Sequence, residues 1–194
     1  MAAFGATYLA VAPITAEESN SITYGTGTRV KHLRRCAITY NWDESKFYGD
    51  NTLAEYYRHL NDADVEIETT ELDAAIAATM GLEKVKSAAS TGVPAVYTLK
   101  TENGDPVGIG LIQCLIVDGT KIFRAIWLHK VSLRPNNETS ATKEETMAWQ
   151  APTIAGKAWP VVLDATGEDQ IRDFSEFETE AAAETWIKSK ANIS

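Results

Sequence analysis

Residues 106–131, PVGIGLIQCLIVDGTKIFRAIWLHKV, decide the fold, because two long hydrophobic runs are joined there by Asp118-Gly119. Asp-Gly is a strong signal for a two-residue hairpin, since a type I′ turn needs a positive φ at both of its central positions. Asn103-Gly104 carries the same signal and would join this segment to residues 94–100. The sequence therefore predicts a three-stranded antiparallel meander over residues 94–132.

Tight turns at both places would fix which side chains face each other across the strands. Ile112 is then opposite Ala125, and Cys114 is opposite Phe123. Gly110 would lie between the rings of Tyr97 and Trp127 and leave room for both. The other face of the meander would carry apolar side chains of all three strands: Val96, Ile109, Leu111, Leu115, Ile122, Ile126 and Leu128.

Both faces of this predicted meander are hydrophobic, whereas an antiparallel sheet in a small monomer usually shows one polar face to water. We therefore expect two covers, one from a second sheet or a helix and the other from a neighbouring subunit. The sequence predicts a mainly β (α+β) fold of two packed antiparallel sheets, with a short flanking helix and a C-terminal helix. We therefore expect the chain to assemble with other copies of itself.

Two helices and one linker complete the expected organisation. Thr70 would cap a short helix that stops at Gly81, and Ser175-Glu-Phe-Glu is a capping box for a helix that reaches about Lys188. We expect a β domain over residues 1–163 with a long interaction loop at 42–61. The remaining residues, 164–194, would be a linker and a C-terminal helical extension.

Composition is that of a folded soluble protein, with 194 residues, 44% hydrophobic and 23% charged. The sequence has neither a run of about 20 apolar residues nor a basic n-region at its N-terminus, so we expect a cytosolic product and no membrane partner. The net charge of −9 disfavours binding of phosphates by clustered cations. It would suit a protein that lies close to DNA without gripping it, although solubility explains it equally well.

Motifs for chemistry are absent from the sequence. Cys36 and Cys114 are far apart, which favours two buried reduced thiols. His32, His59 and His129 have no carboxylate or cysteine at ligand spacing, so no metal site is expected. No nucleophile elbow, Walker loop, zinc-protease helix or dinucleotide fingerprint occurs. We therefore expect no catalytic residue and no cofactor, and a protein that is not an enzyme.

Residues 42–61 are too aromatic for a loop that only connects two strands, and too polar for a strand of the core. Long ordered loops in compact domains are usually functional, and aromatic side chains anchor protein interfaces. The candidate anchors are Trp42, Phe47, Tyr48, Tyr56 and Tyr57. The alternative is a twisted hairpin that folds these aromatic side chains onto its own domain.

A short acidic strand follows that loop. Residues 64–68 alternate strictly, which turns Val65 and Ile67 inward and leaves the acidic side chains outward. The outward set is Asp64, Glu66 and Glu68. An exposed acidic face is far commoner than a catalytic carboxylate pair.

Several short segments carry a resemblance to a known family. In chain order they are Tyr8-Leu-Ala-Val-Ala-Pro, Thr23-Tyr-Gly-Thr, Phe47-Tyr-Gly-Asp-Asn, Asp64-Val-Glu-Ile-Glu, Phe123-Arg-Ala-Ile-Trp-Leu-His-Lys-Val, Thr142-Lys-Glu-Glu and Gln150-Ala-Pro-Thr-Ile-Ala-Gly. Their order and spacing over residues 5–160 resemble the major tail protein family of long-tailed bacteriophages, especially those of Gram-positive hosts. The helix expected from residue 175 departs from the core pattern of that family.

The resemblance implies a structural virion protein, assembled in the host cytoplasm and located in the tail. Hexameric rings of a β-sandwich-like subunit would join their inner strands into one barrel and stack into the tail tube, the conduit for DNA ejection. The partners would be the protein itself and tail proteins such as the tape measure, terminator and baseplate components. DNA would pass through without specific binding.

The resemblance also suggests places for the two candidate sets of residues. The aromatic residues of 42–61 would contact the next ring, and the carboxylates of 64–68 would face the lumen and repel DNA phosphates. The alternative for these carboxylates is the outer wall of the tube.

Two other classes of protein stay open. One is a β-rich oligomeric binding module, such as a head-decoration or receptor-contacting protein. The other is a small β-rich enzyme with a cryptic site. Size in solution distinguishes a tube protein from a monomer with a ligand pocket. A tube protein should form rings or filaments at high concentration, and such a monomer should not.

Overall fold

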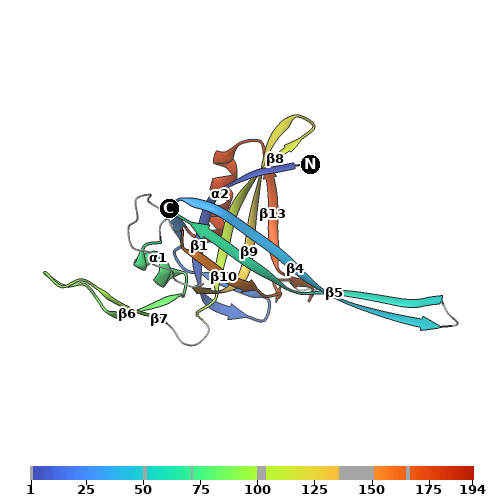
Figure 1. Cartoon of the computed structure of the whole chain (residues 1–194), viewed down its shortest axis with the longest axis horizontal. Coiled ribbons are helices and arrows are strands. Elements are labelled where there is room, and N and C mark those ends of the chain that lie inside the picture. The colour runs from blue at the N-terminus through green and yellow to red at the C-terminus, as the bar shows by residue number, and fades with distance from the viewer. Residues whose placement is uncertain (1, 50–51, 71, 100–103, 136–150, 165–166) are drawn as a thin grey trace, which may run out of the picture.

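A computed structural model covers the whole chain, and it describes residues 2–49, 52–70, 72–99, 104–135, 151–164 and 167–194. Over these residues the protein is mainly β with two helices, which confirms the predicted fold class (Figure 1). The strands are β1 Ala2–Glu18, β2 Ser21–Tyr24, β3 Thr28–Val30, β4 Leu33–Gly49, β5 Thr52–Thr69, β6 Glu83–Ser87, β7 Val96–Leu99, β8 Val107–Val117, β9 Thr120–Pro135, β10 Thr153–Ala158, β11 Val161–Val162, β12 Asp169–Gln170 and β13 Arg172–Phe177. The helices are α1 Ala74–Thr79 and α2 Glu180–Ala191.

Most strands belong to one large antiparallel sheet with the order β2-β1-β8-β9-β10-β5-β4. β3 also pairs with β1, and β13 pairs with the first half of β9, whose second half pairs with β10. Figure 1 shows β4 and β5 crossing over β8 and β9. The two packed layers predicted from the sequence are therefore two halves of one continuous sheet.

The β8–β9 hairpin forms with the predicted turn and register. Asp118 has a φ of 49° and Gly119 a φ of 81°, as a type I′ turn requires. Ile112 pairs with Ala125, and Cys114 pairs with Phe123. This part of the meander is confirmed.

The predicted first strand of the meander is wrong. β7 pairs with β6 in a separate two-stranded sheet, and β8 pairs instead with β1. The side chains of Leu9 and Val11 in β1 are fully buried, whereas Val96 in β7 is 46% exposed. Pairing of β1 with β8 thus buries apolar side chains of β1, whereas β7 pairs outside the core and leaves Val96 exposed. Of the predicted turn, Asn103 lies outside the described residues.

Gly110 is small for a different reason from the one predicted. Its cross-strand neighbours are Ala10 and Trp127, and Tyr97 is not among them. A Cβ atom at Gly110 would lie 2.6 Å from Cγ2 of Ile187 and 2.9 Å from Cε3 of Trp127. The space that Gly110 leaves is filled by α2.

Both faces of the β8–β9 hairpin are covered within one chain. One face packs between the two halves of the large sheet with α1, in a core that includes Leu9, Ile67, Ile109, Leu111, Ile126 and Ile154. The opposite face packs against α2, in a core that includes Ile112, Phe123, Trp127, Ala183 and Ile187. The expectation that a neighbouring subunit covers one face is therefore wrong at this hairpin.

Both helices begin later than predicted. The side chain of Asp73, not Thr70, caps α1, and its Oδ1 accepts a hydrogen bond from the Ala75 backbone N–H at 2.7 Å. Thr179 caps α2, with its Oγ1 3.3 Å from the backbone nitrogen of Ala182.

The C-terminal segment belongs to the same core. Ser175, predicted in a capping box, lies in β13 and pairs with Ala125 of β9. The first part of the predicted linker and extension at 164–194 contains two strands, β12 and β13. Because β13 completes the large sheet and α2 covers one of its faces, the expected boundary near residue 164 does not separate these elements from the core.

Candidate functional site

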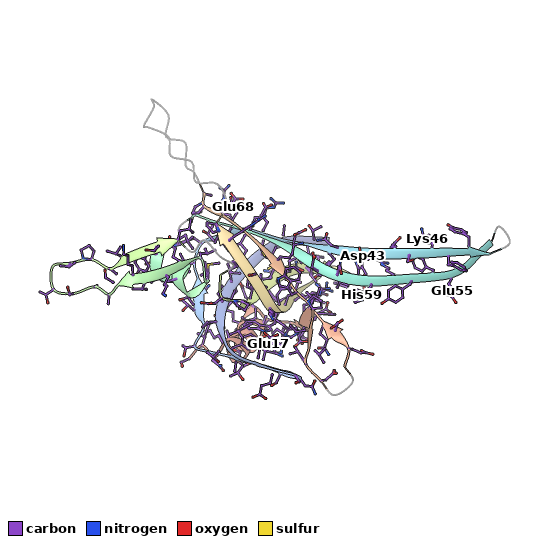
Figure 2. All side chains as sticks on the ribbon, turned by 90° about the horizontal axis from the view of Figure 1, so that it is seen from below. Glu17, Asp43, Lys46, Glu55, His59 and Glu68 are labelled. Carbon is purple, nitrogen blue, oxygen red and sulfur yellow. The ribbon has the colours of Figure 1, made fainter. Side chains whose placement is uncertain are left out.

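The expected interaction loop at 42–61 is an ordered β-hairpin. β5 pairs with β10 only up to Ala63, and beyond that point β4 and β5 are paired with each other alone. This part of the hairpin, residues 42–49 and 52–60, projects from the body and is called the arm here (Figures 1 and 2). At about 3.3 Å per residue, the eight residues of its first strand reach roughly 26 Å.

The aromatic side chains of the arm face solvent. Their exposed fractions lie between 46% and 66%, for Trp42, Phe47, Tyr48, Tyr56 and Tyr57. The alternative in which the hairpin folds these side chains onto its own domain is therefore wrong. Aromatic residues are the commonest anchors of protein interfaces, so the arm has the surface of a contact element.

One face of the arm satisfies its own polar groups. The guanidinium of Arg58 lies over the Trp42 ring at 4.0 Å, and the Glu44 carboxylate lies 3.9 Å from Arg58 Nε and 4.0 Å from Lys46 Nζ. A hydrogen bond to Glu44 raises the pKa of Tyr56. These cross-strand contacts hold the register and engage Trp42 and Tyr56 within the arm.

The other face of the arm presents apolar surface. Phe47 and Tyr57 are each about two thirds exposed, and the Tyr57 ring stacks on His59 with centroids 6.3 Å apart. Asp43 and Glu55 share this face by register, and Figure 2 shows Asp43, Glu55 and His59 along the arm. Aromatic surface flanked by carboxylates is therefore what this face offers to a partner.

The acidic strand alternates as predicted. Val65 and Ile67 are buried, and the intervening side chains point away from the core: Asp64 and Glu66 are exposed, and Glu68 is partly buried. This outward face belongs to the body of the protein, where Figure 2 shows Glu68. Whether it faces a lumen or an outer wall stays a prediction.

Each of these three carboxylates has a cationic partner. Asp64 lies 3.4 Å from Lys157 Nζ, and Glu66 lies 2.9 Å from Arg35. Glu68 lies 2.8 Å from Arg34. Hydrogen bonds from Asn41 and Lys157 outweigh partial desolvation and lower the pKa of Asp64. The face is therefore a row of ion pairs, so its field is weaker than the sequence alone suggests.

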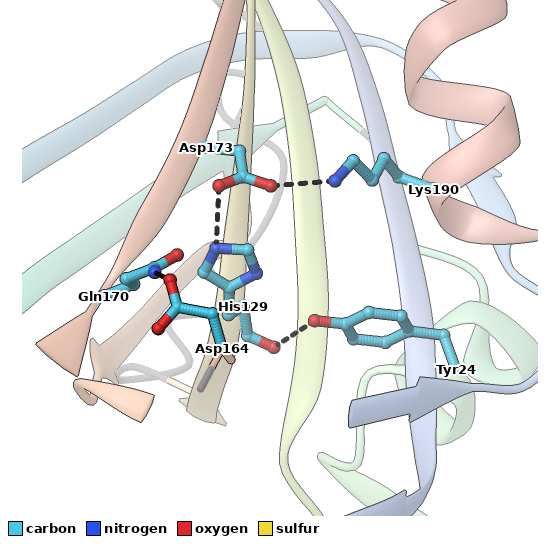
Figure 3. Close-up of polar contacts among 6 residues, drawn as sticks. All are labelled: Tyr24, His129, Asp164, Gln170, Asp173 and Lys190. Atoms are coloured by element: carbon cyan, nitrogen blue, oxygen red, sulfur yellow. Dashed lines mark hydrogen bonds and ion pairs between the residues drawn. The ribbon is translucent and has the colours of Figure 1, made fainter. Parts of the chain in front are cut away.

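A partly buried polar cluster surrounds His129, near the middle of β9 (Figure 3). Nε2 of His129, a side chain 3% exposed, lies 3.3 Å from Oδ1 of Asp173, and Lys190 Nζ donates to Oδ2 at 2.7 Å. The Tyr24 hydroxyl donates to the His129 carbonyl at 2.9 Å. Burial lowers the pKa of His129 and outweighs the nearby carboxylate. The cluster ties β2, β9, β13 and α2 together, and its burial favours a structural role.

The cysteines are placed as buried thiols. Cys114 is buried, and Cys36 is partly buried in contact with the main core. Burial raises the pKa of the Cys36 thiol to about 12, which keeps it protonated and unreactive.

Within the described ranges, no group of three His, Cys, Asp or Glu side chains is arranged to hold a metal ion. Neither α1 nor α2, the helices of the part of the chain that the structure describes, has the length and apolar character needed to cross a membrane.

The arm is thus the candidate functional site. No protein-family model matches the chain, and no curated protein does so either.

Proposed function

We propose that this protein is a structural subunit that polymerises as stacked rings into a bacteriophage tail tube, the conduit for DNA ejection. The arm carries the proposal. This ordered hairpin exposes five aromatic side chains to solvent. Their burial in a contact with another molecule would be favourable in free energy. Contact with another subunit would bury them, and a projecting arm reaches beyond the subunit that bears it.

The open edge of the large sheet supports assembly as well. Among the described strands, the 17-residue β4 pairs with β5 alone, so its other edge presents backbone N–H and C=O groups. Such an edge is a template for another strand, and closing a sheet into a barrel removes it. Rings whose sheets join edge to edge would satisfy this requirement.

Charge is consistent with a conduit for DNA. The net charge of −9 disfavours adhesion of a polyanion, as a tube that releases DNA requires. If the carboxylates of β5 face the lumen, their ion pairs would make the wall nearly neutral there. DNA would then slide without strong attraction or strong repulsion.

A β-rich binding module, such as a head-decoration or receptor-contacting protein, is the second candidate. The arm favours it too, because exposed aromatic side chains can bury themselves against a different protein. The two candidates differ in what the purified protein does alone. A tube subunit assembles with itself, and a binding module does not form tubes.

Electron microscopy of the purified full-length chain at rising concentration tests the proposal. We expect stacked rings with a regular axial repeat. A variant in which Asn-Gly replaces residues 45–57 keeps the Glu44–Arg58 pair and provides a matched control, which should fold and not stack. A wild-type protein that stays monomeric at every concentration would refute the proposal, and closed oligomers without tubes would favour the binding module.

A further inference from the structure

A second hairpin projects from the side of the molecule opposite the arm. Figures 1 and 2 both show β6 and β7 at one end and the arm at the other. β6 and β7 form a two-stranded sheet that, in the described part of the chain, joins no other strand. An isolated two-stranded hairpin is marginally stable in water. This hairpin, like the arm, is therefore an element that gains from a partner.

The β6–β7 hairpin also exposes apolar side chains. Val85, Val93, Val96 and Leu99 are between 46% and 56% exposed. Between Glu83 and Leu99 the charged residues are Glu83, Lys84 and Lys86, which gives an excess of one positive charge. The arm carries Asp43, Glu44 and Glu55 against Lys46 and Arg58, an excess of one negative charge. The two projections are thus both apolar and opposite in charge, which favours contact between them.

A groove lies where the β6–β7 hairpin meets the body. Its volume is about 470 Å³, within the range of pockets that hold small ligands, so it has room for an aromatic side chain. The lining includes Pro13 of β1, Ala75 and Ala78 of α1, Val85 of β6 and Tyr97 of β7, together with the polar residues Thr26, Thr79 and Asp105. These side chains are mostly apolar or aromatic, as a pocket for a phenyl or phenol ring requires.

We propose that the arm of one copy docks into this groove of a second copy, with Phe47 and Tyr57 as the inserted side chains. The partner is a second copy because one chain carries, at one end, an aromatic projection with an excess of one negative charge. At its other end it carries a largely apolar groove beside a projection with an excess of one positive charge. Such a contact is head-to-tail and repeats from copy to copy. The inference rests on the proposed function for the presence of self-assembly, and it names the surface that receives the arm.

Cross-linking between two variants that each gain one cysteine tests the contact. Phe47→Cys and Val85→Cys proteins are mixed under assembly conditions and treated with a short bismaleimide, and mass spectrometry identifies the linked peptides. The native Cys36 and Cys114 are buried or partly buried, and the wild-type protein measures their background. We expect a 47–85 link with about tenfold higher yield than in a control mixture of Phe47→Cys and Ile116→Cys. Ile116 is as exposed as Val85 but lies on β8, away from the groove.

A charge variant gives the second measurement. Val85→Asp places a carboxylate in the groove, where it would repel Asp43 and Glu55 of the docked arm, and should raise the concentration needed for assembly about tenfold. Val93→Asp, on the same projection but outside the groove lining, should change that concentration little. Both are surface substitutions and should leave the melting temperature unchanged.

The outcomes separate this inference from the proposed function. Tubes in wild-type protein, with a 47–85 yield no higher than the control, would overturn the docking groove and leave the tube intact. A specific 47–85 link in a protein that forms no tubes would support the docking contact and refute the proposed function. Arm-to-arm links alone would overturn the head-to-tail arrangement.

Discussion

Two long antiparallel hairpins, β8–β9 and the arm, have the same secondary structure and opposite surroundings. In β8–β9, Trp127 and Ile126 are fully or almost fully buried, because β1, β13 and α2 cover the hairpin. In the arm, Phe47 and Tyr57 are about two thirds exposed, because β4 and β5 there have only each other. Hydrophobic side chains in a hairpin therefore do not reveal whether their cover comes from the same chain or from another.

The largest expected effect contrasts an aromatic side chain in each hairpin. Trp127→Ala should cost about 3–5 kcal/mol of unfolding free energy, because it leaves a cavity between β8 and α2. Tyr57→Ala should stay within about 0.5 kcal/mol in the isolated subunit. Urea unfolding of both variants below the assembly concentration measures the difference. Equal costs would break the comparison, since the arm would then have intramolecular cover.

The second effect tests the close approach of α2 to β8. Gly110→Leu should cost about 1–3 kcal/mol, because the new side chain would clash with Ile187 and Trp127. Gly5→Leu is the matched control in β1, where a Cβ meets no atom within 4 Å. Thermal unfolding followed by circular dichroism compares the two variants. An unchanged melting temperature for Gly110→Leu would mean that α2 does not pack there.

Local signals were enough to predict the β8–β9 hairpin but not its neighbours. Asp118-Gly119 fixes its own turn, and the flanking hydrophobic runs then set the register. β8 and β7 are separated by few residues, yet β8 pairs with β1 from the start of the chain. That choice depends on the apolar surface buried by each alternative, which no local pattern expresses.

The sequence predicted only part of the candidate site, because the rest depends on contacts that local patterns do not express. Residue types indicated the candidate aromatic anchors of 42–61, but the division of the arm into two faces depends on register shifts at Asn41/Trp42 and Phe47/Tyr48. Hairpin signals there were weak, so the segment was predicted as a loop. The His129–Asp173 contact joins residues 44 positions apart, and nothing in the spacing of the histidines indicated it.

The third effect is a pH dependence of the free energy of unfolding, and it arises at His129 in the buried β8–β9 hairpin. Burial holds the pKa of His129 below its ordinary value of 6.5 in the folded protein. As pH falls below 6.5, the unfolded state takes up the proton first, so the free energy of unfolding decreases. Urea unfolding between about pH 7.5 and about pH 5 measures this loss. His129→Gln should flatten the curve in that window, and an unaltered slope would contradict the buried neutral histidine.

Asp173 extends the acid sensitivity to lower pH. Burial raises the pKa of its carboxyl group, but the Lys190 hydrogen bond and the charges of His129 and Lys190 outweigh burial and lower it. The stability that this pair contributes is present above the ordinary pKa of 3.8 and is lost as pH falls through the lowered value. Lys190→Met should remove this part of the acid dependence.

The smallest effect on stability concerns the ion pairs of β5. Changing Asp64, Glu66 and Glu68 to Lys removes exposed or half-exposed pairs, each worth about 0–1 kcal/mol. If this face lines the lumen, DNA should be retained in the tube and ejection should slow, most strongly at low salt.

A control separates position from net charge. Changing Glu168, Asp169 and Glu178 to Lys alters the charge equally at exposed positions of other elements. Ejection kinetics of particles that carry each variant decide the matter. Unchanged ejection kinetics with normal tube assembly would favour the outer-wall placement of the β5 carboxylates, and equal slowing in both variants would mean that net charge, not position, sets the rate.

Sedimentation velocity of one arm variant tests the central claim, that the arm buries its aromatic face in assembly. The variant replaces Phe47 and Tyr57 with Ser, and the control replaces Glu44 and Lys46 with Ser on the opposite, self-paired face. We predict that the Phe47/Tyr57 variant keeps the wild-type melting temperature and remains monomeric at concentrations where the wild type and the control assemble. Assembly of that variant at the wild-type concentration would contradict the account.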